Sequence, residues 1–243
     1  MVVERVKAAP PAEVIGGAVT LWRARLADWE PQAARLAGWL SADERVRMGR
    51  FREPALATRY AIGRGLLRGL LARYLGVDPA ALVFQQNAYG KPLLGNPSLI
   101  EFNVSHSGET LLIAVSAERP VGVDAERIDD APISGAEAER VLAPDERAYW
   151  GRLPAGARAD FFFQTWVRKE AALKALGVGL QIEPNTFSVG VGPLASIRRL
   201  GGQHLRVFDL EMTGPIKAAL AVIGPEMPGT IRRYELATSA LPF

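Results

Sequence analysis

The sequence of 243 residues contains no cysteine and only two histidines. The absence of cysteine excludes disulfide bonds, thiolate metal sites and cysteine nucleophiles. His106 and His204 are too few for a zinc site built from histidine ligands. Long apolar runs are also missing, since no stretch approaches the ~20 residues of a membrane span. The first 14 residues have no apolar core behind their charges. We therefore expect no membrane span, no signal peptide and a cytoplasmic location.

Several well-known site motifs are absent as well. The chain has no G-x-x-x-x-G-K-[ST] motif and no G-x-G-x-x-G on a strand-to-helix turn, so neither a P-loop nor a Rossmann nucleotide site is indicated. It has no G-x-S-x-G elbow for a serine hydrolase. The net charge is +3, an excess that ordinary solubility explains. No nucleic-acid-binding motif accompanies it, so we expect no nucleic-acid partner.

The residues that are present favour a mixed α+β fold. Hydrophobic residues make up 49% and charged residues 23% of the chain, as in globular proteins. The apolar spacing predicts a helix over residues 54–75 that ends at Gly76, preceded by a helix capped by Ser41 and Glu44. Residues 144–176 also have a helical pattern, interrupted by GRLPAGAR at 151–158.

The strand predictions are less regular. AYGKPLL reads as a turn between short strands, and residues 102–108 as a polar turn. TLLIAVS and VGVDAER read as a hairpin joined by Glu118, Arg119 and Pro120. The tail offers strands at 186–191, 204–210 and 217–224 in an antiparallel meander, and residues 1–20 read as a loose lead-in. Each half thus has a long helix and a few strands, which divides the chain into 1–120 and 121–243.

Two acids in the sequence VGVDAER form the first candidate site. Asp124 and Glu126 are two residues apart in a strand-like segment, so both side chains point to one face of a sheet. Such a pair can offer oxygen ligands to a hard cation. The alternative is a solvated edge strand. The apolar neighbours Val121, Val123 and Ile128 argue against that alternative.

The segment WVRKEAALKALGVGL forms the second candidate site. Trp166, Glu170 and Lys174 follow at four-residue steps and therefore share one face of a helix. Glu and Lys at this spacing are commonly a surface ion pair worth about 0.2–0.5 kcal/mol. The aromatic run at 161–163 and the apolar residues at 171–173 favour a site instead. Three carboxylates, Lys174 and the nearby His106 are sufficient for metal-assisted chemistry on a phosphate.

Together the motifs resemble those of the Sfp-type 4′-phosphopantetheinyl transferases. The resemblance is carried by GKP at 90–92, FNVSHS at 102–107, GVDAE at 122–126 and WVRKEAALK at 166–174, in the family's order and with similar spacing. It implies a pseudo-twofold α+β monomer with the active site between two similar halves. It also implies the reaction, in which coenzyme A donates its 4′-phosphopantetheine arm to a serine of an apo acyl or peptidyl carrier protein and 3′,5′-ADP is released. Such enzymes serve fatty-acid synthesis or secondary metabolism.

The resemblance also implies roles for individual residues. Asp124, Glu126 and Glu170 would bind magnesium, with manganese as an alternative, in the half 121–243 that also receives the carrier. Glu170 would be the base and Lys174 the group that stabilises the leaving phosphate. Lys169 points roughly 100° away from Glu170 on the helix, toward phosphate or solvent. The coenzyme A contacts implied, largely in the half 1–120 that faces the 3′-phosphate and the adenine, are Arg47, Arg59, Arg64, Lys91, Ser105, His106 and Lys174.

Other functions use the same residues. A magnesium-dependent phosphohydrolase would need the three carboxylates and a placed water but no carrier. A binding module would hold coenzyme A or carriers without turnover, although the intact acids and lysine argue against it. The sequence leaves open which carrier is served and whether Glu170 acts directly or through a metal-bound water.

Overall fold

The computed structural model describes residues 18–95, 98–129, 132–195, 197, 199–226 and 228–238. Helices and strands alternate irregularly along the chain, which confirms the α+β class. The strands are β1 Ala18–Arg25, β2 Phe84–Gln86, β3 Pro92–Leu94, β4 Ile100–Ser107, β5 Thr110–Ala117, β6 Val121–Arg127, β7 Arg199–Leu200, β8 Gln203–Asp209, β9 Ile216–Ile223 and β10 Thr230–Glu235. The α-helices are α1 Ala33–Gly38, α2 Ala42–Met48, α3 Pro54–Leu75, α4 Gly135–Val141, α5 Pro144–Arg152 and α6 Ala155–Leu176. Short 3₁₀ helices lie at Leu26–Gln32, Pro79–Ala81, Gly179–Gln181 and Pro184–Thr186.

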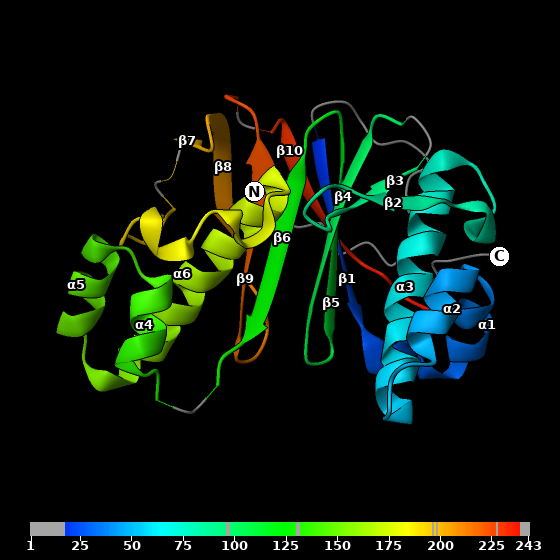
Figure 1. The fold of residues 1–243 in the computed structure, drawn as a ribbon, viewed down its shortest axis with the longest axis horizontal. Coiled ribbons are helices and arrows are strands. Elements are labelled where there is room, and N and C mark those ends of the chain that lie inside the picture. Colours follow the sequence, from blue (N-terminus) through cyan, green and yellow to red (C-terminus); the bar gives the residue numbers. More distant parts are fainter. Residues whose placement is uncertain are drawn as a thin grey trace.

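The first sheet has the strand order β10-β1-β5-β4, and α3 packs against one of its faces. Large apolar side chains from β1 and from the helical side fill this core, including Trp22, Trp29, Leu66 and Leu70. The indole of Trp22 stacks on the ring of Tyr234 from β10 with centroids 4.6 Å apart. Helices α1, α2 and α3 therefore form the outer layer of the first half (Figure 1).

The second sheet has the order β6-β9-β8-β7, and α6 covers it. The contact uses small residues, with Ala171 and Ala175 of α6 facing Ala219 and Ala221 of β9. Small side chains allow a helix to lie close to a sheet, and the short distance between α6 and its sheet positions the polar residues of both elements. Helices α4 and α5 lie beyond α6 on the outer flank (Figure 1).

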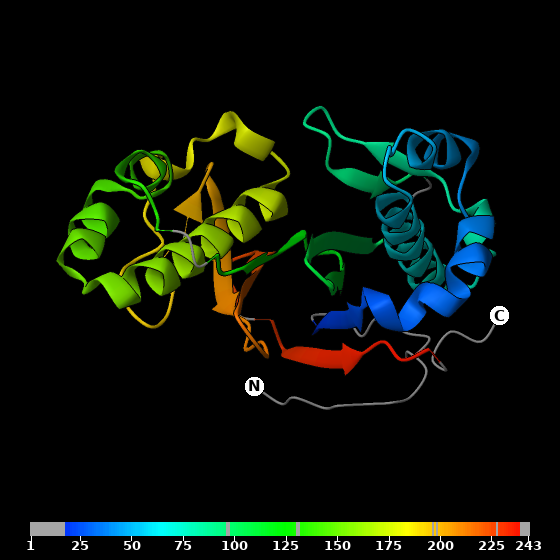
Figure 2. The same cartoon turned by 90° about the horizontal axis from the view of Figure 1, so that it is seen from below.

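A third core joins the two sheets through the faces that the helices leave free. Leu21 of β1 and Leu112 of β5 meet Val121 and Val123 of β6 and Leu220 of β9 there. The result is a layered arrangement in which both sheets lie between two groups of helices, as the view from below shows (Figure 2). β6 runs through the middle of the molecule, next to strands of both sheets (Figure 1).

The chain crosses between the halves twice. The expected division at residues 120 and 121 falls between β5 and β6, which belong to different sheets. The chain then returns, because β10 pairs in parallel with β1, from Ala18 opposite Thr230 to Arg23 opposite Glu235. The first sheet is thus completed by residues near the end of the chain. Among the described residues, none of the helices combines the length and the hydrophobicity that crossing a membrane requires.

The long helices follow their sequence signals. Helix α3 begins at Pro54 and ends before Gly76, whose φ of 65° is the left-handed conformation that glycine adopts readily. Helix α2 carries the predicted capping box. The Ser41 hydroxyl accepts the amide N–H of Glu44, and the Glu44 carboxylate accepts that of Ser41.

Several strand predictions were wrong. β5 does not form a hairpin with β6, because both of its edges are already paired, with β1 and with β4. Residues 102–107 are not a turn but part of β4, and the turn comes at Gly108. Residues 186–191 form no strand. Residues 18–20 of the supposed lead-in belong to β1, while residues 1–17 lie outside the described part.

Candidate active site

The acids of β6 face helix α6. Along this strand Val121, Val123 and Ala125 enter the core between the sheets, so the alternate residues point the other way. Asp124 is buried, with 3% of its surface exposed, and Glu126 is half-buried. The alternation predicted from sequence therefore places both carboxylates on one face of the sheet, at the start of the second half.

Gly122 allows α6 to lie directly against β6. A Cβ atom at this position would come within 2.1 Å of the carbonyl oxygen of Ala171 and 2.3 Å of the amide nitrogen of Ala175. Both are main-chain atoms of α6, so no side chain can move aside. The glycine of the G-x-D-x-E motif thus sets the distance between the acids of β6 and the polar stripe of α6.

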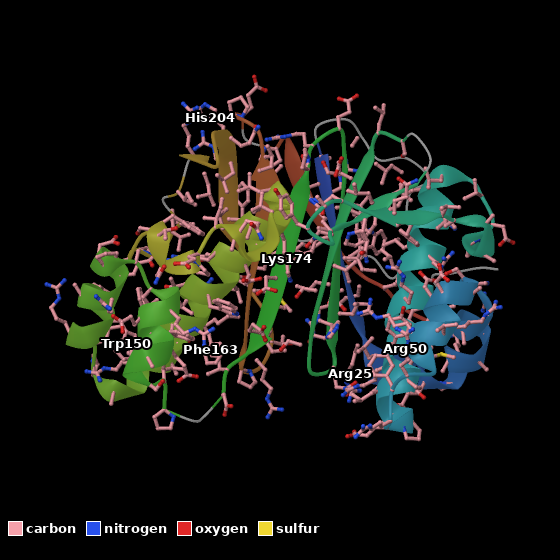
Figure 3. All side chains as sticks on the ribbon, viewed as in Figure 1. Arg25, Arg50, Trp150, Phe163, Lys174 and His204 are labelled. Atoms are coloured by element: carbon pink, nitrogen blue, oxygen red, sulfur yellow. The ribbon has the colours of Figure 1, made fainter. Side chains whose placement is uncertain are left out.

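Trp166, Glu170 and Lys174 form that stripe, as the four-residue spacing predicted. Lys174 Nζ lies 2.6 Å from Asp124 Oδ1 in an ion pair, and the Trp166 side chain lies near Glu126, where it acts to lower the pKa of that carboxyl. Glu170 lies between Trp166 and Lys174 on the helix and interacts electrostatically with Asp124 and Glu126. Figure 3 shows Lys174 near the middle of the molecule, beside β6.

Burial and neighbouring charges raise the pKa values of two carboxylates in this site, Glu126 and Glu170. Burial raises the pKa of Glu126, and the charge of Asp124 raises it further. Burial likewise raises the pKa of Glu170, Asp124 adds to the effect, and Lys174 opposes it. Each shift favours the protonated acid, because a charge is costly away from water and next to a like charge. The site is therefore short of positive charge.

The donor atoms suit a hard cation, although they are not gathered into a finished ligand set. Within the described residues, no three His, Asp or Glu side chains are grouped closely enough to hold a metal ion. Asp124 Oδ2, however, is buried without a hydrogen-bond partner. A buried carboxylate oxygen without a partner is costly, and a bound cation would satisfy it. Carboxylate oxygens are the ligands that magnesium prefers.

Two predicted coenzyme A contacts are engaged inside the protein. Ser105 is buried, and its hydroxyl donates to Asp124 Oδ1 at 2.9 Å. Lys91 Nζ donates to the carbonyl oxygens of Val121 at 3.2 Å and Ala175 at 3.1 Å. Burial lowers the pKa of Lys91. His106 lies between the buried residues Ser105 and Ser107 and is exposed, so it remains accessible to a phosphate.

The predicted arginines lie on the helical side of the first half. Arg47 is exposed on α2, with its guanidinium 5.7 Å from the centre of the Tyr60 ring. Arg59 pairs with Glu109, and Arg64 pairs with Glu44. In the part of the chain that the structure describes, none of these arginines bonds directly to the acids of β6 or α6. Their contact with coenzyme A stays a prediction.

Lys169 reaches neither phosphate nor solvent. Its side chain is fully buried, and Nζ lies 2.6 Å from Oε2 of Glu146, which is equally buried. The expectation for Lys169 was wrong because its face of α6 turns toward the loop after the helix. There Nζ donates to the carbonyl oxygens of Pro184 and Phe187.

The contacts of Asn103 and Ser107 with β6 were not predicted from the sequence. The Ser107 hydroxyl donates to Glu126 Oε2 at 3.2 Å, and the Asn103 side chain accepts the amide N–H of Val123 at 2.9 Å. Their signal was present in FNVSHS, where polar residues recur at every second position. That spacing is typical of one face of a strand.

Comparison with known proteins identifies the class to which this fold and site belong. The pattern of the 4′-phosphopantetheinyl transferase superfamily matches residues 120–217, and that of the 4′-phosphopantetheinyl transferase N-terminal region matches residues 22–118. The chain therefore belongs to the 4′-phosphopantetheinyl transferase superfamily.

Individual relatives agree with this assignment. The 4′-phosphopantetheinyl transferase HetI of a Nostoc species is 38% identical over 218 residues, which cover 88% of this chain and 92% of the relative. The 4′-phosphopantetheinyl transferase ffp of Bacillus subtilis is 31% identical over 83% of this chain and 90% of its own. Sfp of Bacillus subtilis strain 168 is 30% identical over 64% of this chain and 68% of its own.

Proposed function

We propose that this chain transfers the 4′-phosphopantetheine arm of coenzyme A to a serine hydroxyl of an apo acyl or peptidyl carrier protein. The observation that carries the proposal is the arrangement of Asp124 and Glu126 on β6 opposite Glu170 and Lys174 on α6. The ion pair of 2.6 Å between Lys174 and Asp124 fixes this arrangement. The family to which the chain belongs indicates the reaction, and the charges of these four residues are suited to it.

Asp124, Glu126 and Glu170 would hold magnesium, or manganese in its place. The unpartnered Asp124 Oδ2 and the raised pKa values of both glutamates support this. A cation would give the buried oxygen a partner and would offset the cost of ionising the two glutamates. When bound, the metal supplies positive charge that neutralises the pyrophosphate of coenzyme A.

Glu170 is the proposed base for the carrier serine. The family resemblance implies this role, and carboxylates are common general bases. The serine oxygen forms a new bond to the β-phosphorus, the bond from that phosphorus to the bridging oxygen breaks, and 3′,5′-ADP leaves. The serine proton passes to Glu170. Lys174 Nζ stabilises the negative charge that develops on the leaving phosphate.

The substrate contacts divide between the halves. Exposed His106 and Arg47, with Arg59 and Arg64 nearby on α3, supply positive charge or hydrogen-bond donors for the phosphates. The net charge of +3 suits an acidic carrier, which a basic enzyme attracts. We propose a monomer that acts in the cytoplasm and needs neither a membrane nor nucleic acid.

Release of 3′,5′-ADP tests this proposal against its alternatives. The transferase releases 3′,5′-ADP in proportion to apo carrier and leaves coenzyme A intact when no carrier is present. A phosphohydrolase would cleave coenzyme A without carrier, and a binding module would release no product in either case. Lys174→Ala should slow the release strongly and leave much of the coenzyme A binding intact.

A further inference from the structure

β4 and β6 are edge strands of different sheets, yet they lie side by side. β4 ends the order β10-β1-β5-β4, and β6 begins the order β6-β9-β8-β7. Across the described residues, no backbone ladder joins them. An edge strand normally leaves a row of N–H groups without partners, and such groups are costly when buried. β6 is buried from Val121 to Ala125, so its free edge needs acceptors.

Side chains of β4 supply these acceptors. Alternate residues of β4 accept N–H groups from alternate residues of β6, because both strands repeat every second residue and the two spacings match. The donors and acceptors are Val123 N to Asn103 Oδ1 at 2.9 Å, Ala125 N to Ser105 Oγ at 3.2 Å and Arg127 N to Ser107 Oγ at 2.8 Å. We call Asn103, Ser105 and Ser107 the seam.

Each serine of the seam also holds one acid. Ser105 Oγ donates to Asp124 Oδ1 at 2.9 Å, and Ser107 Oγ donates to Glu126 Oε2 at 3.2 Å. A hydroxyl has one proton to donate. In both serines that proton is committed to a carboxylate, and none is left for a phosphate oxygen. Ser105 Oγ further accepts from Lys174 Nζ at 3.3 Å.

The hairpin of β2 and β3 contacts the neighbouring parts of β6 and α6. Lys91 Nζ bridges Val121 O of β6 and Ala175 O of α6. Asn87 Nδ2 donates to the carbonyl oxygen of Gly177, just past the end of α6, at 2.7 Å. Side chains of the first half therefore anchor both elements that carry the acids and Lys174.

We propose that the seam consists of positioning residues, which hold Asp124 and Glu126 in the geometry that binds the metal and do not themselves bind coenzyme A. This inference rests on the proposed metal role of the two acids. Residues that orient metal ligands typically affect metal affinity by 10–100-fold when they are replaced.

The first test is amide hydrogen exchange in the metal-free protein, comparing wild type with Ser107→Ala. We expect the Arg127 amide to lose at least about tenfold of its protection, because its acceptor is gone. The amides of the intervening β6 residues, which face β9, should keep theirs. Ser107→Thr retains the hydroxyl and should restore protection. Unchanged exchange at Arg127 in Ser107→Ala would show that the Ser107 hydroxyl does not protect β6, and would refute the proposed role of the seam independently of metal binding.

The second test is the affinity for Mn²⁺, measured by calorimetry with coenzyme A present, and the affinity for coenzyme A in chelator. Ser105→Ala and Ser107→Ala should weaken Mn²⁺ binding about 10–100-fold and leave coenzyme A binding in chelator unchanged. Ser116→Ala is the matched control, because Ser116 is buried and, among the described residues, its hydroxyl hydrogen-bonds only Ala117 O. It should change neither affinity.

The opposite pattern contradicts the inference. Weaker coenzyme A binding in chelator with unchanged Mn²⁺ affinity would make Ser105 and Ser107 phosphate contacts. Wild-type protein that binds no Mn²⁺ even with coenzyme A would refute the proposed metal role instead. Because the exchange experiment uses metal-free protein, it separates this failure from a failure of the seam.

Discussion

Replacing Lys169 with methionine removes a buried positive charge, and we predict a large loss of stability. Lys169 and Glu146 have fully buried side chains, with Nζ 2.6 Å from Oε2. Nζ also donates to the carbonyl oxygens of Pro184 and Phe187, each at 2.7 Å. Burial lowers the pKa of Lys169, and the Glu146 charge opposes that shift. The lysine thus ties α5 and the loop after α6 to α6 itself.

The expected magnitude follows from what the variant leaves behind. In Lys169→Met the Glu146 carboxylate keeps, among the described residues, only the amide N–H groups of Ala143 and Val189 as donors. Removing one partner of a buried ion pair costs about 3–5 kcal/mol, because the remaining charge is uncompensated. In a chain of 243 residues, each kcal/mol lowers the melting temperature by about 2–4 °C. We therefore expect a decrease of about 6–20 °C.

Calorimetry and urea unfolding measure this loss, with Lys217→Met as the matched control. Lys217 Nζ also lies 2.6 Å from a carboxylate, that of Asp160, but 59% of the Asp160 side chain is exposed. Such a pair is worth about 0–1 kcal/mol. The reasoning is refuted if Lys169→Met loses no more stability than Lys217→Met. It is equally refuted if the folded variant keeps its stability and loses coenzyme A binding, since Lys169 would then contact substrate.

Further predictions concern the contact between β6 and α6. Gly122→Ala should destabilise the protein by about 1–3 kcal/mol or more and abolish transfer, because its Cβ meets main-chain atoms of α6; normal melting and turnover would show that the close approach is unnecessary. In chelator, Glu170→Gln should have a higher melting temperature than wild type, and this difference should grow as pH rises. A group whose pKa is raised on folding stabilises the protein fully below its unfolded value of 4.5 and loses that contribution as pH rises through the folded value. When magnesium replaces the chelator, wild type should gain about 2.7 kcal/mol of stability at a hundredfold excess over Kd, and Glu170→Gln should not. An equal gain in Glu170→Gln would show that Glu170 is not a metal ligand.

Local sequence signals predicted the parts of the site that depend on short-range periodicity. Pro54 and Gly76 mark the ends of α3 because proline suits the start of a helix and glycine its end. The four-residue steps from Trp166 to Lys174 and the two-residue step from Asp124 to Glu126 define two faces. The structure turns these faces toward each other.

Long-range pairing could not be predicted in the same way. β1 is buried on both faces over most of its length, so it shows no alternation of polar and apolar residues. Its parallel partner β10 lies more than 200 residues away along the chain. The segment at 186–191 resembles a strand, but main-chain groups of Phe187 and Val189 are satisfied by the side chains of Lys169 and Glu146. No local pattern reveals such partners.

Intact-protein mass spectrometry of apo carrier proteins is the most direct test of metal-dependent transfer by the acids of β6 and α6. Each carrier is incubated with coenzyme A, magnesium and either wild type or Asp124→Ala, with and without chelator. We predict that wild type adds the mass of one phosphopantetheine arm to at least one carrier, and that chelator or Asp124→Ala abolishes the gain. The account is contradicted if no carrier gains mass with wild type, or if the gain survives both chelator and the loss of Asp124.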